Sequence, residues 1–114
     1  MIRPALLAIL LIITPTLALA HSKAERTTPK DGATVVEVPE LLMQFDDPMR
    51  IISVTLTSPT GEVEVERQTG VEPVLEFRAS PAQVLTRGNY RFDWRGMAAD
   101  GHPMQGRFSF TVSE

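Results

Sequence analysis

Two histidines and one aspartate are the residues of this chain whose types and positions favour metal chemistry. His21 and His102 are the only histidines among 114 residues, and Asp100 lies two positions before the second of them. Gly101, which stands between Asp100 and His102, adds no side chain that would crowd an ion. Imidazole nitrogens and a carboxylate oxygen are ligands for divalent transition metals. If the three residues converge, they form a candidate metal site.

The first twenty residues have the pattern of a cleavable secretory signal. Arg3 gives a positive start, residues 5–13 are an unbroken apolar run, and Ala18-Leu19-Ala20 is a small-x-small cleavage sequence. The alternative is a membrane anchor, which takes about 20 consecutive apolar residues, but Thr14-Pro15 interrupts this run. We therefore expect export, cleavage after residue 20 and a mature product that is not embedded in the membrane.

Cleavage at that position would turn one histidine into a chelate. His21 would become the N-terminus and carry a free α-amine and an imidazole on the same residue. Two donors on one residue close a small ring, so the second bond costs little additional ordering entropy. With His102 and Asp100 the set has three nitrogens and one oxygen, which suits copper(II), the highest of the divalent ions in affinity. The alternative is a plain terminus, an ordinary turn at Asp100-Gly101 and a surface histidine.

The composition narrows the class of protein. Removal of 20 residues from the 114 leaves 94, enough for one small domain over residues 21–114. The chain has no cysteine, which excludes disulfides and thiolate ligands. Its formal charge is −3, and no basic stripe is visible, so nucleic acid is not an expected partner.

Short runs that alternate between apolar and polar residues predict about seven strands and no helix. In the clearest run, Tyr90, Phe92 and Trp94 face one side and three charged residues face the other. Short strands separated by turn residues at intervals of roughly 8–12 residues predict an all-β, immunoglobulin-like antiparallel Greek-key β-sandwich or barrel. The expected strands cover residues 35–38, 41–45, 51–57, 62–67, 74–79, 90–95 and 107–112, with residues 96–106 as a loop.

Two of these strands also give a prediction of which side chains are buried. In residues 51–57 the alternation places Ile52, Val54 and Leu56 on one apolar face. In residues 74–79 it places Leu75 and Phe77 together, facing the core.

Several segments resemble the CopC family of periplasmic copper-resistance proteins. The most specific is Asp100-Gly101-His102-Pro103, followed by Gly106 and by Phe108-Ser109-Phe110, in a chain with a histidine at its expected mature N-terminus. The resemblance covers essentially all of residues 21–114, and its further segments are residues 28–35, 39–45 and 85–95.

This resemblance implies a cupredoxin-like or immunoglobulin-like β-barrel that carries copper(II) in the periplasm without being an enzyme. It also implies a partner, a membrane copper transporter of the CopD type. The copper(II) ligands of the family, an N-terminal histidine and an Asp-x-His pair, fall on His21, Asp100 and His102. Some members also hold copper(I) in a methionine-rich loop, but here the methionines are scattered, as Met43, Met49, Met97 and Met104.

Two other functions remain open from the sequence. One is a copper oxidase that uses an N-terminal histidine and a second histidine, as polysaccharide monooxygenases do. Against it, Asp100 would occupy a position that oxygen activation needs open, and a domain of this size leaves little surface for a polymer. The other is a structural interaction module that binds no metal.

Overall fold

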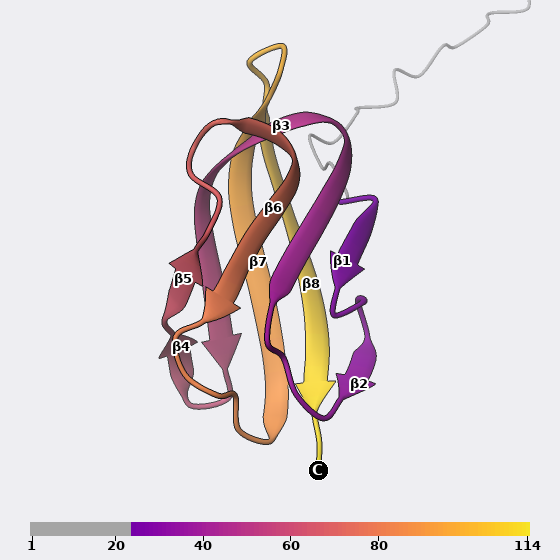
Figure 1. Cartoon of the computed structure of the whole chain (residues 1–114), viewed down its shortest axis with the longest axis vertical. Helices are drawn as coiled ribbons and strands as arrows, with labels where there is room; N and C mark the ends of the chain where they lie inside the picture. Colours follow the sequence, from indigo (N-terminus) through magenta and orange to yellow (C-terminus); the bar gives the residue numbers. More distant parts are fainter. Residues whose placement is uncertain (1–23) are drawn as a thin grey trace, which may run out of the picture.

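The alternating segments form eight β-strands in a computed structural model, which describes residues 24–114 (Figure 1). His21 and the expected signal segment, residues 1–20, lie outside the described residues. Within residues 24–114 there is no helix that is long and apolar enough to cross a membrane. The strands are β1 (Arg26–Thr28), β2 (Ala33–Val35), β3 (Leu41–Ser58), β4 (Gly61–Val63), β5 (Val65–Arg67), β6 (Pro73–Pro81), β7 (Gly88–Ala98) and β8 (Pro103–Val112).

The long strand β3 joins the two halves of the fold. Its first part, Leu42–Gln44, pairs with β1 and β6, and its second part, from Met49 onward, pairs with β7 and finally with β4. Between the two parts, Asp46-Asp47-Pro48 interrupts the register with β6, and proline removes one ladder hydrogen bond there. Figure 1 shows β3 arching from one layer into the other at this point.

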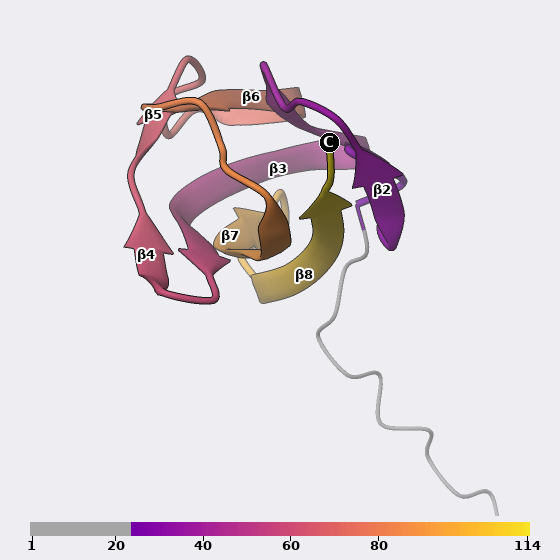
Figure 2. The same ribbon diagram turned by 90° about the horizontal axis from the view of Figure 1, so that it is seen from below.

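The strand order β2-β8-β7-β3-β6-β5 curls around one core, as the view along the strands in Figure 2 shows. All pairings are antiparallel except the short one between β2 and β8, which is parallel. The prediction of an antiparallel immunoglobulin-like or cupredoxin-like β-sandwich is confirmed.

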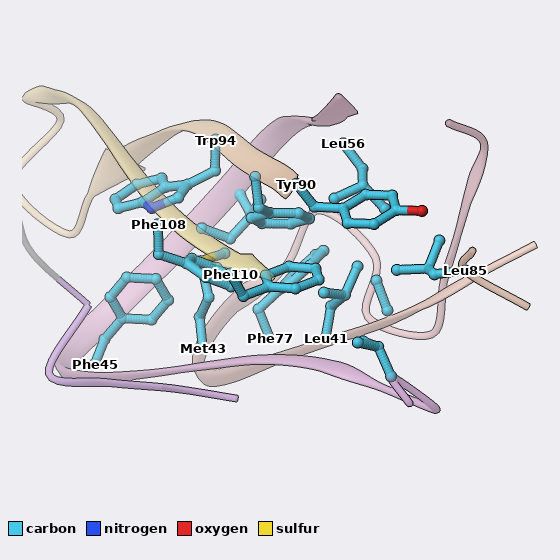
Figure 3. Packing of buried hydrophobic residues seen from close by; sticks show 14 of the residues in the cluster. Leu41, Met43, Phe45, Leu56, Phe77, Leu85, Tyr90, Trp94, Phe108 and Phe110 are labelled. Carbon is cyan, nitrogen blue, oxygen red and sulfur yellow. The ribbon is translucent and has the colours of Figure 1, made fainter. Parts of the chain in front are cut away.

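The core is a row of aromatic side chains on the inner faces of β7 and β8, packed against β3 and β6 (Figure 3). Phe92 lies 5.0 Å from Phe108 between ring centroids, and Trp94 meets Phe45 edge to face at 5.3 Å. Met43, Phe77 and Phe92 have no exposed area. The inward face predicted for Tyr90, Phe92 and Trp94 is therefore correct.

Two side chains that were predicted to face the core are exposed instead, and each lies at an irregularity of β3. Ile52 is 50% exposed because the register with β7 shifts between Ile51 and Ser53, so that one extra residue is left unpaired. Such a bulge reverses which side chains face the core, and Ile51 is buried instead. Leu75 is 55% exposed because β3 kinks away from β6 and leaves it without a partner residue.

The strand boundaries also differ from the sequence prediction. The expected strands 41–45 and 51–57 are one strand, β3, and the expected strand 62–67 is split into β4 and β5. The segment 96–106, expected to be a loop, is mostly strand, because β7 continues to Ala98 and β8 begins at Pro103. Only a tight turn remains between them, and this turn carries Asp100 and His102.

The indole of Trp94 lies against the backbone of two glycines. A Cβ atom built on Gly106 would stand 2.6 Å from Nε1 of Trp94, and one built on Gly96 would stand 3.3 Å from its Cζ3. Gly106 pairs directly with Trp94 across the β7–β8 ladder, and Gly96 is two residues further along the same face of β7. Both glycines therefore provide the space that the ring occupies.

Candidate metal centre

The turn between β7 and β8 is closed by two backbone hydrogen bonds. The N–H of Ala98 donates to the carbonyl oxygen of His102 at 2.9 Å, and the N–H of Gly101 donates to the carbonyl oxygen of Ala98 at 2.9 Å. Gly101 has a φ of +88°, which side-chain-bearing residues rarely adopt. In Figure 1 this hairpin projects at the top of the molecule, beyond the other strands.

Both carboxylate oxygens of Asp100 contact His102. One accepts a hydrogen bond from the backbone N–H of His102 at 3.1 Å, and the other lies 2.5 Å from Nδ1 of its ring. The side chains of His102 and Asp100 are 74% and 62% exposed. No group among residues 24–114 bonds the second ring nitrogen, Nε2. The carboxylate therefore orients the imidazole and leaves Nε2 open to solvent.

The pKa of Asp100 is lowered, first by the hydrogen bond from the backbone N–H of His102 and second by the one from its side chain. Both favour the charged carboxylate. The stability that they contribute is therefore present above the ordinary pKa of an aspartate and is lost as the pH falls through the lowered one.

We expect the carboxyl carbon of Asp100 to titrate below the ordinary range in an NMR pH series. In His102→Ala the backbone donor remains and the ring is lost, so the pKa of Asp100 should rise only part of the way. A full return to the ordinary value would show that the ring, and not the backbone N–H, is the main cause.

The structure brings together two of the three residues predicted to bind metal. Asp100 and His102 form a direct pair, whereas His21 lies outside the described residues. In the part of the chain that is described, no three metal-ligating side chains of the His, Cys, Asp or Glu types gather in one place. The described residues therefore supply an incomplete set of ligands, a carboxylate and an imidazole.

The start of the described chain points toward this hairpin. β1 and β7 both pair with β3 along the edge opposite to β6. β1 comes first along β3, with Arg26 level with Gln44, and β7 follows, with Ala98 level with Met49. The next residue back, Glu25, has a raised pKa because its carboxyl hydrogen-bonds with that of Asp46 and is repelled by its charge. Ala24 and Glu25, the described residues before β1, therefore lie beside the kink of β3 on the side of Ala98.

The alternation pattern did not predict that Ala98 closes the turn that carries the pair. The available signal was Gly101, since Asp-Gly is typical of tight hairpin turns. Met104, which follows the turn, packs against the core, and Met43 and Met49 are buried. Met97 is 41% exposed on the outer face. The four methionines are thus divided between the core and the surface.

Comparison with known proteins identifies relatives of this fold and sequence. The model of the CopC domain matches residues 24–113. Among curated proteins, the copper resistance protein C of Escherichia coli is 26% identical over 106 residues and covers 83% of each chain. The copper resistance protein C of Xanthomonas campestris pv. juglandis is 29% identical over 110 residues, covering 83% of this chain and 82% of its own.

Solved structures show the same fold. PcoC from Escherichia coli, described as a methionine-rich copper resistance protein, superposes with a TM-score of 0.67 at 24% identity, over 82% of this chain and 100% of PcoC. CopC from Methylosinus trichosporium OB3b superposes with a TM-score of 0.66 at 20% identity, over 82% of this chain and 94% of its own.

Proposed function

The chain belongs to the CopC family, and from that membership we propose that it is a periplasmic copper(II) carrier, exported by its signal segment and not an enzyme. The observation that carries the proposal is the Asp100–His102 pair at the tip of an exposed hairpin. An imidazole that is oriented by a carboxylate and has a free second nitrogen is a frequent arrangement around metal-binding histidines. The relatives named for copper resistance support copper as the ion.

The proposed ligands are the α-amine and imidazole of His21, the imidazole of His102 and a carboxylate oxygen of Asp100. An oxygen that hydrogen-bonds Nδ1 of His102 lies on the opposite side of the ring from Nε2, so Asp100 would release Nδ1 when it binds the same ion as Nε2; the freed carboxylate oxygen is then available as a ligand. Nitrogen donors with one oxygen suit copper(II), whereas the thioether of Met104 is packed against the core. The proposal is therefore a single site that prefers copper(II) to copper(I).

The register of the sheet supports the contribution of His21. Counting back along β1 from the pair Arg26–Gln44 places Ala24 level with Asp46 of β3. His21 is three positions before Ala24, and Met49, which pairs with Ala98 beside the hairpin, is three positions after Asp46. Three extended residues span about 10 Å. The reach of the chain from Ala24 to His21 is thus similar to the distance along β3 from Asp46 to Met49.

The direct test is a copper(II) titration of the mature protein, with its N-terminal residue verified by mass spectrometry. We expect one equivalent to bind, and His102→Ala to lose most of the affinity. Met104→Leu is the matched control, because it alters the same hairpin and removes a thioether but no proposed ligand. Absence of stoichiometric binding, or an unchanged affinity in His102→Ala, would reject the site.

The exposure of the hairpin also bears on what happens to the ion. A site at the tip of a turn is accessible to a receiving protein, and we propose a membrane transporter of the CopD type as that partner. A carrier should leave polysaccharide unoxidised when the copper-loaded protein is given ascorbate and oxygen. Oxidised sugar products would instead establish the alternative of an N-terminal-histidine oxidase.

A further inference from the structure

The curled sheet is open along one seam, between β1 and β8. A groove of about 720 Å³ lies there, lined by β1, by the segment after it and by β8, with Leu42, Trp94 and Phe108 among its apolar residues. Figure 1 shows the two strands side by side, β1 in purple and β8 in yellow. Among the described strands, β1 pairs only with β3, and β8 pairs with β7 and, at its end, with β2. Within residues 24–114, no strand fills the seam.

The edge of β8 that faces the seam presents backbone groups ready to bind another strand. Ser109 uses its carbonyl oxygen and its N–H on this edge, accepting from the N–H of Gly32 at 2.7 Å and donating to Asp31 at 2.9 Å. Backbone groups alternate in direction along a strand, so the N–H and C=O groups of Gln105 and Arg107 point the same way. In the described residues no strand pairs with β8 at these two positions on that side.

The groove is also lined by a hydrogen-bond donor. Trp94 is only 3% exposed and lines the groove, and its Nε1 lies against Gly106 on β8. Among residues 24–114 no buried side-chain nitrogen or oxygen lacks a hydrogen-bond partner, so this N–H is not an orphaned buried group but belongs to the lining of the groove. An occupant that brings a carbonyl oxygen here would accept a hydrogen bond from it.

We propose that the β1–β8 seam binds an extended segment of a partner polypeptide, added as a strand to the edge of β8. Four backbone groups of Gln105 and Arg107 would hold the segment, as in other cases of strand addition. Alternate side chains of the segment would face Trp94 and Phe108, which favours apolar residues at those positions.

The charges beside the groove specify the remaining positions of the segment. Arg26 and Lys30 are exposed on its β1 side, and neither forms a salt bridge within residues 24–114. Two acids also line the groove, and each has a hydrogen-bond partner. The carboxyl of Glu25 hydrogen-bonds with that of Asp46, and Asp31 accepts from the N–H of Ser109. The complementary partner is therefore a segment in which apolar residues alternate with acidic ones.

The test uses isotope-labelled protein and two blocked synthetic peptides, one of alternating valine and glutamate and one of alternating valine and lysine. The chain has one tryptophan, so the indole N–H of Trp94 gives a single NMR signal. We expect the glutamate peptide to shift this signal and to protect the amides of Gln105 and Arg107 from hydrogen exchange. The lysine peptide should bind at least about tenfold more weakly.

Charge reversal provides the matched variants. Arg26→Glu combined with Lys30→Glu should reverse the preference between the two peptides, whereas Arg87→Glu, an exposed change outside the groove, should not. The proposal is overturned if neither peptide moves the Trp94 signal, or if both bind equally. It is also overturned if the two amides are already protected in the free protein, or become protected only as its own concentration rises, because the occupant is then the chain itself or a second copy.

Discussion

One methionine placed before His21 should remove most of the copper(II) affinity of the mature protein, although every side chain of the proposed site remains. The extra residue converts the free α-amine into an amide nitrogen, which is not a neutral donor, and opens the small ring that His21 would form. Metal sites in proteins bind with large free energies, of order 10 kcal/mol or more. Losing one of four donors should cost several kcal/mol, with each 1.4 kcal/mol a factor of about ten.

A competition titration against a chelator of known affinity measures this loss, with mass spectrometry to verify both N-termini. The control is one additional residue after Glu114, because the C-terminus lies at the end of the molecule opposite to the Asp100–His102 hairpin (Figure 1). That protein should bind as tightly as the unextended one. Equal affinity with and without the N-terminal methionine would show that the amine is not a ligand.

The largest effect that we expect on stability comes from a single methyl group, in Gly106→Ala. The new Cβ would lie 2.6 to 2.9 Å from three atoms of the Trp94 indole, Nε1, Cε2 and Cζ2. The ring is restricted on two sides, where it contacts Phe45 and fits closely over Gly96. Overpacking of this kind costs about 1–3 kcal/mol, which a denaturant titration of the metal-free protein should show as a lower midpoint.

Gly70→Ala is the matched control for this variant. Its Cβ would also meet an atom at 2.5 Å, but that atom is the carboxylate end of Glu72, an exposed side chain that can turn away. We expect its free energy of unfolding to change little. A second check is Trp94→Phe in the Gly106→Ala background, where the smaller ring should relieve part of the loss. Equal effects of the two glycine substitutions would contradict the packing argument.

The fold class was predictable because alternation is a local property. The apolar faces of β7 and β8 repeat every second residue over long uninterrupted runs, and these runs form the core strands. The strand limits were less predictable. Alternation fades over Met97 to Gln105, yet the backbone continues as strand to both sides of the turn, because β7 and β8 pair as far as Met97 and Pro103.

The candidate metal site was predicted from residue types rather than from the periodicity of the sequence. With two histidines and no cysteine in the chain, the choice of ligands was small. An aspartate two residues before His102, with glycine between them, predicted that both side chains project to one side, and the structure shows a direct hydrogen bond between them. The convergence of His21 with this pair stays a prediction, supported by the register of β1 on β3.

The sequence by itself determined the sandwich, its aromatic core and the Asp100–His102 pair, because each depends on residues that are neighbours in the chain or repeat at a fixed interval. Tertiary structure alone decided that Ile51 rather than Ile52 is buried, that Leu75 is exposed and that Gln105 and Arg107 present an open edge. These outcomes depend on which strands pair and where the ladders slip. Pairing is settled between residues far apart in the chain, where the local pattern carries no information about the partner.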